Sequence, residues 1–254
     1  MPQTITLDAK PGPIDIDPAR AAVIVVDMQN DFGSRGGMFD RMGIPLDGFT
    51  RAADTIGPVL DAARASGFRI VYLKMGFHPD LSDLGAEGSP SRVRHLAVGV
   101  GQAVTTPAGT EGRILVRDTW NTEIVDALKP RPEDRIVYKH RYSGFYETEL
   151  DSVLKEAGIT QLIVTGCTTS VCVESTVRDA YFRDYQTVLL TDCMDENIGK
   201  SLARSNHDAS LLLVEILFGW VTASEQFLMA CRGPRVNAMS PQASASSAQR
   251  GASS

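Results

Sequence analysis

The stretch AAVIVVD at residues 21–27 decides the fold, because an unbroken apolar run, mostly β-branched, ends in a single aspartate. A strand buried on both faces of a parallel sheet has this composition, whereas a strand with one wet face alternates apolar and polar residues. We therefore predict a strand over 21–26 inside a parallel sheet.

Working outward from this stretch, apolar runs alternate with helical patterns along the chain. Further strands are predicted at residues 69–73 (RIVYL), 135–138 (RIVY), 161–165 (QLIVT), 187–191 (TVLLT) and 211–218. Helices are predicted at residues 53–66, 147–157, 171–184, 198–210 and 225–231, with one helical turn near 91–97. Strands that alternate with helices predict an α/β fold with helices on both faces of a parallel sheet.

The domain organisation follows from composition. Residues 1–20 are rich in Pro and Asp and predict an extended N-terminal arm, and the length and composition of 21–231 predict one α/β domain. Residues 232–254 are rich in Ser and Ala and predict a disordered tail. The irregular segment 76–113, rich in Gly, Pro, Ser and Asp, is too long for an ordinary connection and predicts a lid or substrate loop.

Charge and cysteine content exclude several classes of function. The 254 residues carry a formal charge of −6 without a basic stripe, which argues against nucleic-acid binding. No apolar run reaches the ~18 residues of a membrane helix, and the first residues do not resemble a secretory signal. Four cysteines in a chain of this length do not form a disulfide framework, so we expect a cytoplasmic protein with reduced thiols.

Three reactive side chains follow three of the predicted strands. Asp27 follows the strand at 21–26, Lys139 follows 135–138, and Cys172 lies in the first turn of the helix after 161–165. In open α/β sheets ligands bind outside the carboxyl ends of the strands, so these residues should converge. A nucleophile, a base and a cation together are what acyl transfer requires.

Cys172 is the candidate nucleophile. Unpaired N–H groups at a helix start and a nearby Lys139 would lower the pKa of a thiol from its usual value of about 8.5. Asp27 could take the thiol proton, and backbone N–H groups of the turn, at Thr168 and Cys172, could form an oxyanion hole. Cys167 is a rival, but it lies too close to the strand end.

These motifs resemble the isochorismatase-like cysteine hydrolases. VVDMQNDF at 25–32, YKHRYSGF at 138–145 and TGCTTSVCVEST at 165–176 carry the resemblance, which extends from about residue 18 to 229. It implies a six-stranded, mostly parallel sheet in a three-layer, Rossmann-like α/β/α fold. It also implies an Asp27, Lys139, Cys172 triad and a cis peptide bond between Cys167 and Thr168.

The same resemblance narrows the expected reaction. RYSGF, CVEST and FGWV (218–221) are similar to ureidoacrylate amidohydrolases, and PDLSDL (79–84) is similar to biuret hydrolases. The expected activity is hydrolysis of a C–N bond in a small ureido or carbamoyl compound through a cysteine acyl-enzyme. Ammonia and carbamate, which decays to carbon dioxide, would be released. A biuret-type or other small-amide hydrolase is the alternative, and Met75 and Phe77 predict an apolar pocket.

Substrate contacts are expected from residues that flank the triad and from the long loop. The candidates are Gln29, Asn30, Phe32, Phe77, His78, His140, Arg141 and Tyr142. Some relatives bind a metal through an Asp-x-His segment, but Gly76 stands where the aspartate would be, so we expect no metal and no other cofactor. As in the family generally, we expect a homo-oligomer, with FGWV and the apolar C-terminal segment facing a partner subunit.

Two readings from other classes of protein stay open at this point. The fold could serve as a non-catalytic binding module, which the intact set of Asp27, Lys139 and Cys172 argues against. A thiol redox protein is the other, but the chain has no Cys-x-x-Cys pair, and only a reversible bond between Cys167 and Cys172 would support it.

Overall fold

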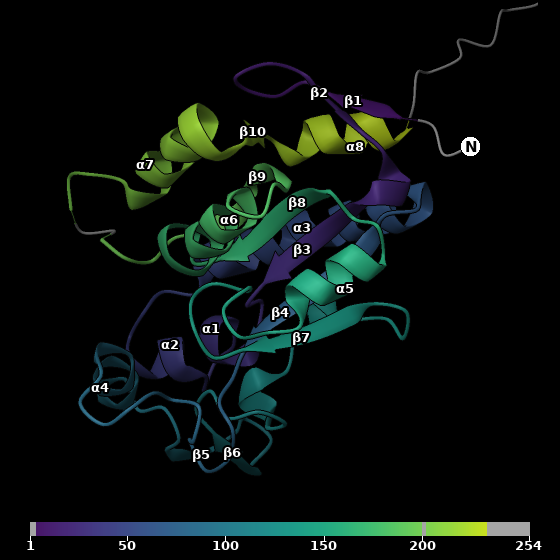
Figure 1. Ribbon diagram of the computed structural model, residues 1–254. Helices are drawn as coiled ribbons and strands as arrows, with labels where there is room; N and C mark the ends of the chain where they lie inside the picture. The colour runs from purple at the N-terminus through teal and green to yellow at the C-terminus, as the bar shows by residue number, and fades with distance from the viewer. Residues whose placement is uncertain (1–3, 200–201, 233–254) are drawn as a thin grey trace, which may run out of the picture.

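Six parallel strands form the central sheet of the computed structural model, which describes residues 4–199 and 202–232 (Figure 1). In sheet order the strands are β10 (Trp220–Thr222), β9 (Gln186–Asp195), β8 (Gln161–Cys167), β3 (Ala21–Val26), β4 (Arg69–Met75) and β7 (Arg135–Lys139). This arrangement confirms the predicted α/β class and the six-stranded parallel sheet.

The chain order of the strands reverses beside β3. From β3 the chain adds β4 and then β7 on one side, and returns to add β8, β9 and β10 on the other. Val26 is paired with Leu73 on one side and with Gly166 on the other. A ligand site is expected at such a switch point, because the connections that leave neighbouring strands there diverge and leave a crevice.

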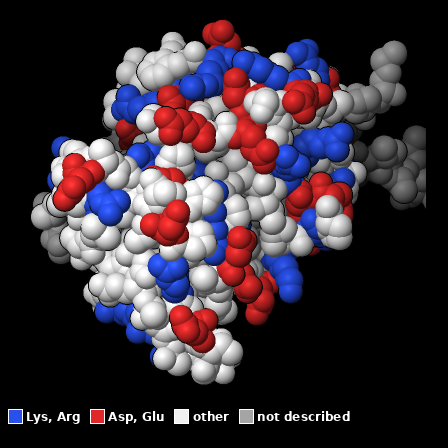
Figure 2. All heavy atoms as spheres, turned by 60° about the horizontal axis from the view of Figure 1, so that its bottom comes forward, with Lys and Arg blue, Asp and Glu red and all other residues white. Residues whose placement is uncertain are grey.

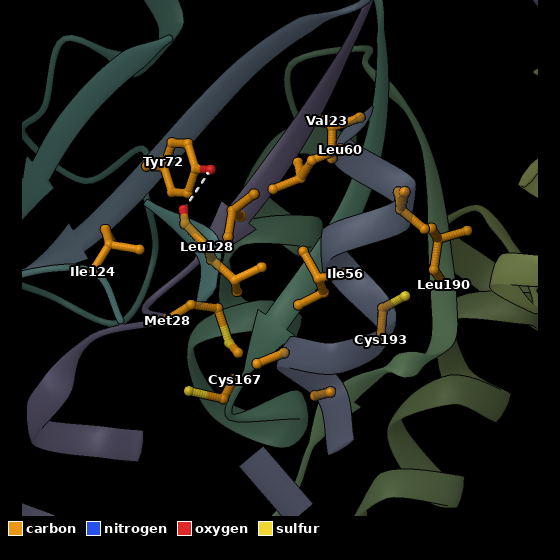
Figure 3. Close-up of a cluster of buried hydrophobic side chains, with 14 of the residues drawn as sticks. Val23, Met28, Ile56, Leu60, Tyr72, Ile124, Leu128, Cys167, Leu190 and Cys193 are labelled. Carbon is orange, nitrogen blue, oxygen red and sulfur yellow. Dashed lines mark hydrogen bonds between the residues drawn. The ribbon is translucent and has the colours of Figure 1, made fainter. Parts of the chain in front are cut away.

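Helices cover both faces of the sheet. One face packs against α3 (Asp47–Ser66) and α8 (Ser224–Arg232), and the other against α5 (Leu150–Glu156) and α6 (Glu174–Tyr181) (Figure 1). Figure 3 shows part of the first cluster, in which Ile56 and Leu60 of α3 meet Val23 of β3. Because Ala22 and Ile24 are buried on the opposite face, β3 has no wet side, as its sequence predicts.

Several helices begin or end away from their predicted positions. The helix predicted at 53–66 begins at Asp47 and ends at Ser66, as predicted, and Gly67 with a φ of 90° forms its left-handed cap. The helix predicted at 171–184 begins as a π-helical turn, Thr169–Val173, and continues as α6. The helix predicted at 198–210 is instead α7 (Asn206–Leu213), because the Ser205 hydroxyl accepts a hydrogen bond from Asp208 N and starts it there.

The strand predicted at 211–218 is wrong. These residues complete α7 and continue as a π-helical turn, Val214–Phe218, and the last strand is β10. A short apolar run does not distinguish a buried strand from a helix, and here the run follows a capped helix start. Gly219 then lets the chain approach β9, since a Cβ there would lie 2.3 Å from the Thr187 carbonyl oxygen.

The N-terminal segment packs on the domain as a hairpin. β1 (Ile5–Leu7) and β2 (Ile14–Ile16) pair antiparallel, and Leu7, Ile14 and Ile16 are buried in the same cluster as α8. The peptide bond Lys10–Pro11 is cis. The predicted tail at 232–254 lies, apart from Arg232, outside the described residues.

The long irregular segment contains structure of its own beyond the carboxyl ends of the strands. It forms α4 (Pro90–Ala97), where a helical turn is predicted, and a hairpin of β5 (Ala103–Thr105) and β6 (Glu111–Arg113). In Figure 1 these elements gather at the lower left with α1 (Asn30–Gly33) and α2 (Met38–Arg41). The segment is thus placed to cover the strand ends.

We predict that Gly166→Ala destabilises the protein and displaces the turn after β8. Gly166 has a φ of 112°, and a Cβ there would lie 2.1 Å from the Val26 carbonyl oxygen, so strain and a backbone clash add. The free energy of unfolding, measured by thermal denaturation, should fall by more than about 2 kcal/mol.

Gly109→Ala is the matched control for that substitution. Its φ is 79°, but nothing lies within 4 Å of the added Cβ, so only strain of about 1 kcal/mol should appear. If the free energy of unfolding fell equally in the two variants, the close approach of Gly166 to β3 would not matter for stability.

Candidate active site

The three side chains predicted to react do meet at the switch point. Asp27 directly follows β3, Lys139 is the last residue of β7, and Cys172 lies in the π-helical turn after β8. Asp27 adopts a left-handed φ of 53°, and its N–H donates to the Leu73 carbonyl oxygen at 2.9 Å. The chain therefore turns sharply at the sheet edge.

A buried ion pair joins two of these residues. Lys139 Nζ lies 2.7 Å from Asp27 Oδ2, and both side chains are at most 1% exposed. Met75 N–H donates to Asp27 Oδ1 at 2.9 Å, and Lys139 Nζ donates to the Arg141 carbonyl oxygen at 3.3 Å. No hydrogen bond of good angular geometry reaches Asp27 Oδ2 from the described residues, despite the short ion-pair distance. This oxygen is thus available to accept a proton.

Cys172 places its sulfur beside the ion pair. The thiol is close enough to both charged groups that the Asp27 carboxylate and the Lys139 ammonium group each shift its pKa. The turn that carries it is held by the Thr168 carbonyl oxygen, which accepts from Val171 N at 3.0 Å and from Val173 N at 3.2 Å. The peptide bond between Cys167 and Thr168 is cis, as the resemblance implies.

The pKa of the Cys172 thiol is raised, so the thiol is protonated at neutral pH, which corrects the expectation of a lowered pKa. Burial raises the pKa of Cys172 to about 12, because removal from water penalises the thiolate more than Lys139 stabilises it. The Asp27 carboxylate adds to this penalty. The sequence indicated the nearby cation and the helix start, but it could not indicate how completely the sulfur is buried.

The two charged partners respond to the same burial. Burial raises the pKa of Asp27 above its usual 3.8, against the opposing attraction of Lys139. Burial alone would lower the pKa of Lys139, but the attraction of Asp27 and Cys172 outweighs it, so this pKa is raised. The resting site holds a thiol beside a carboxylate–ammonium pair.

Cys167 has a different environment. It lies in the apolar cluster on the α3 side, near Met28 in Figure 3, and its Sγ donates to the Asp27 carbonyl oxygen at 3.3 Å. Cys172 belongs to the cluster on the other face of the sheet. The two sulfurs therefore face different surroundings, which argues against both a nucleophilic Cys167 and a redox pair.

A cavity of about 320 Å³ opens onto Cys172 and Thr168. Most of its wall is apolar, and the apolar lining residues are Phe32, Met38, Phe39, Met42, Ile44, Met75, Val98, Leu115, Val171 and Ile198. Its polar lining residues, besides Thr168 and Cys172, are Arg94, His95, Tyr142 and Asn197. The volume is near the lower end of the roughly 300–1,000 Å³ range of ligand pockets, so the site suits a small molecule.

Some predicted substrate contacts line this cavity and others do not. Phe32 and Tyr142 do, as does Thr168, which was predicted for the oxyanion hole. Gln29 does not, because its side-chain amide donates to Met75 O at 2.9 Å and accepts from Met75 N at 2.7 Å. The Asn30 side-chain amide donates a hydrogen bond to the Trp120 carbonyl oxygen at 2.8 Å. These two amides position the strand end and α1 rather than line the pocket.

The other candidates near the second strand and Lys139 are also placed elsewhere. Phe77 is buried behind the pocket against the His95 ring, and the half-exposed His78 lies beside Asp83. Arg141 donates to the carbonyl oxygens of Asp83 and His140, at 2.9 Å and 2.6 Å. The His140 ring lies 3.3 Å from a Glu147 carboxylate oxygen. Short-range position in the sequence could not show that these side chains turn away from the sulfur.

Asp31 is an organising residue that the sequence reasoning missed. Its buried carboxylate accepts hydrogen bonds from Met38 N at 3.0 Å, Leu115 N at 2.7 Å and Asn121 Nδ2 at 2.6 Å. Met38 and Leu115 line the cavity, so one carboxylate fixes two of its walls. The spacing of Asp27 and Asp31 in VVDMQNDF was the available signal. The α4 residues Arg94 and His95 were missed because they lie in an irregular segment.

The chain matches a known family along most of its length. The model of the isochorismatase domain matches residues 21–226. The chain belongs to the isochorismatase family. A protein from Caulobacter segnis named ureidoacrylate amidohydrolase RutB is 37% identical over 226 residues, which are 89% of this chain and 92% of that protein. A protein of the same name from Agrobacterium fabrum is 38% identical over 88% of this chain and 95% of its own length.

Two solved structures agree with the fold. A cysteine hydrolase from Pseudomonas syringae pv. phaseolicola has a TM-score of 0.72 and 31% identity, covering 85% of this chain and 94% of its own. An N-carbamoylsarcosine amidase from Thermoplasma acidophilum has a TM-score of 0.59 at 24% identity, covering 81% of this chain and 97% of its own. At this identity the likeness supports the fold alone.

Three further observations concern possible membrane, nucleic-acid and metal partners. No helix in residues 4–199 and 202–232 has the length and apolar character needed to cross a bilayer. Figure 2 turns the lower side of Figure 1 forward and shows acidic and basic side chains interspersed on that face. Within the described part of the chain, no three His, Cys, Asp or Glu side chains group as metal ligands.

We predict that alkylation of Cys172 by iodoacetamide in the substrate-free enzyme is slow at neutral pH. Its rate should rise with pH without a plateau below about pH 10, because the thiol pKa is raised to about 12 and only the thiolate reacts. Mass spectrometry of the modified peptide measures the rate, with Cys172→Ala as the blank.

Lys139→Met should slow this alkylation further, since it removes the cation that stabilises the thiolate. A plateau near pH 7 in the wild type would mean that the sulfur is already ionised, contrary to the burial argument.

Proposed function

We propose that this isochorismatase-family protein is an amidohydrolase that cleaves a C–N bond of a small ureido or carbamoyl compound of the ureidoacrylate type. The observation that carries the proposal is the Cys172 thiol, which lies beside both members of a buried ion pair and faces a small cavity. The names of relatives at 37–38% identity supply the substrate class.

The first half of the reaction uses Asp27 as a base. As the Cys172 sulfur attacks the ureido carbonyl carbon, its proton moves to the Asp27 carboxylate, whose Oδ2 also contacts Lys139. A C–S bond forms and the carbonyl becomes a tetrahedral oxyanion. Asp27 then gives the proton to the departing nitrogen, the C–N bond breaks, and a carbamoyl group remains on sulfur.

The second half restores the thiol. Water adds to the acyl carbon, Asp27 takes its proton, and the C–S bond breaks as the sulfur regains a proton. The released carbamate decays to ammonia and carbon dioxide. Atoms balance, because the enzyme consumes one water for the ureido C–N bond that it hydrolyses, and the decay of carbamate needs only a proton.

Lys139 has an electrostatic role in both halves. Fully buried and with a raised pKa, it stays protonated and stabilises the developing thiolate and the Asp27 carboxylate in turn. The backbone N–H groups of Thr168 and Cys172, both residues at the cavity wall, are the proposed oxyanion hole. One such donor typically contributes about 3 kcal/mol to stabilisation of the transition state.

Two further expectations complete the proposal. We place the protein in the cytoplasm and expect it to act as a homo-oligomer. A groove lined by Phe182, Ile216, Leu217, Phe218 and Trp220 supports the second point, since Phe182, Ile216 and Leu217 are large apolar side chains exposed to solvent. It includes part of the FGWV motif, and a second copy of the chain is the partner that we propose for it.

Cys172→Ala should abolish ammonia release from ureidoacrylate while circular dichroism shows an unchanged fold. Asp27→Asn should lower kcat by about 10²–10⁴-fold, because the general base is lost. Cys231→Ala is the control, since this cysteine lies outside the cavity, and it should retain full activity. Full activity in Cys172→Ala would refute the mechanism.

Ile216→Glu combined with Leu217→Glu should lower the molecular mass found by sedimentation velocity. Two charges placed on an apolar contact leave unpaired carboxylates in the interface, which costs more than the contact contributes. Met229→Glu, at a similarly exposed apolar side chain on α8, is the control and should leave the mass unchanged. A monomeric wild type would contradict the expected assembly.

A further inference from the structure

Helix α4 places two neighbouring polar side chains at the wall of the reactive cavity. Its start is capped by the Ser89 hydroxyl, which accepts from Arg92 N at 3.3 Å. His95 is buried and Arg94 is exposed, and both line the cavity that contains Cys172. One helix therefore offers the substrate an imidazole inside the pocket and a guanidinium group at its mouth.

The His95 ring is held in place, and one of its two nitrogens makes a hydrogen bond within α4. Nδ1 lies 2.7 Å from the Ser91 carbonyl oxygen, and because a carbonyl only accepts, Nδ1 carries the proton. The ring packs against Phe77, with centroids 5.2 Å apart, and against Tyr142 at 5.7 Å. Burial lowers the pKa of His95, and the nearby Arg141 and Lys139 charges lower it further. The imidazole is thus neutral.

The other nitrogen of this ring is a hydrogen-bond acceptor. A neutral imidazole protonated on Nδ1 has a lone pair on Nε2. In the described part of the chain nothing donates to His95 Nε2. The rest of the cavity wall is mostly apolar, so a substrate N–H that enters the pocket finds few acceptors besides this one.

Arg94 is the cation that remains available to an anionic ligand. Lys139 is buried against Asp27, and Arg141 is committed to two carbonyl oxygens. Arg94 has neither an ion-pair partner nor a hydrogen-bond acceptor among residues 4–199 and 202–232, and no other Lys or Arg of those residues lines the cavity. Arg is well suited to bind a carboxylate in a bidentate manner.

We infer that α4 is the specificity element for a ureido acid: His95 Nε2 accepts a hydrogen bond from the ureido N–H, and Arg94 binds the carboxylate at the other end. The apolar walls contact the carbon atoms between them. This inference rests on the proposed function and narrows it, because a compound without a carboxylate, such as biuret, uses only the His95 contact.

The Arg94 contact is tested by comparing two ligands. Arg94→Gln should lower kcat/KM for ureidoacrylate about tenfold, mainly through KM, because a charged hydrogen bond is lost. It should leave biuret unchanged, measured as a substrate or as a competitive inhibitor. Arg94→Lys should recover part of the loss, and Arg51→Gln, an exposed charge away from the cavity, should change neither.

The His95 contact is tested by a matched pair of substitutions. His95→Phe keeps the ring packing but removes the acceptor, so kcat/KM for ureidoacrylate and the affinity for biuret should both fall about tenfold. His95→Gln places an amide oxygen near the former Nε2 and should retain most of both. Circular dichroism and unfolding temperature check that each variant folds.

The outcomes separate the two proposals. Equal effects of Arg94→Gln on ureidoacrylate and biuret, or no effect on either, would refute the inference alone. Equal losses in His95→Phe and His95→Gln would do the same for the acceptor. A wild-type protein that hydrolyses no ureido compound would refute the proposed function, and the inference with it.

Discussion

The buried ion pair between Lys139 and Asp27 constrains the rest of the structure. Taking two charges out of water costs several kcal/mol each, and only close, well-satisfied contact compensates for this. The 2.7 Å separation therefore requires the ends of β3 and β7 to be held in register across β4. Gln29 contributes, because its amide binds both backbone groups of Met75, the residue that also donates to Asp27.

The same burial decides the chemistry. A thiol placed beside this pair, away from water, keeps its proton, with a pKa raised to about 12. Nucleophilic attack then needs proton transfer to Asp27 during the reaction, rather than a thiolate that is ready beforehand. Such a site protects its sulfur from unrelated electrophiles, because a neutral thiol is a weak nucleophile. A substrate that develops negative charge next to Lys139 is what makes the transfer favourable.

Reaction and recognition come from different parts of the chain. The sheet edge supplies the reacting groups, and the long insertion after β4 supplies the polar groups of the pocket mouth through α4. Asp31 links the two, because its carboxylate binds backbone N–H groups of α2 and of the segment after β6. The scaffold can therefore keep its triad while the insertion determines which small molecule fits.

The sequence alone determined the α/β class, the strand cores and the three reacting residues, because β-branched runs and polar residues just past them depend on local pattern. It did not determine that 211–218 is helical, since a short apolar run suits either structure until its neighbours are known. Tertiary structure alone decided that the side chains of Gln29 and Arg141 make hydrogen bonds to backbone groups. It also decided that Arg94 and His95 line the cavity. It likewise decided the protonation of Cys172. The side-chain placements and this protonation both depend on which groups, distant in sequence, pack together and exclude water.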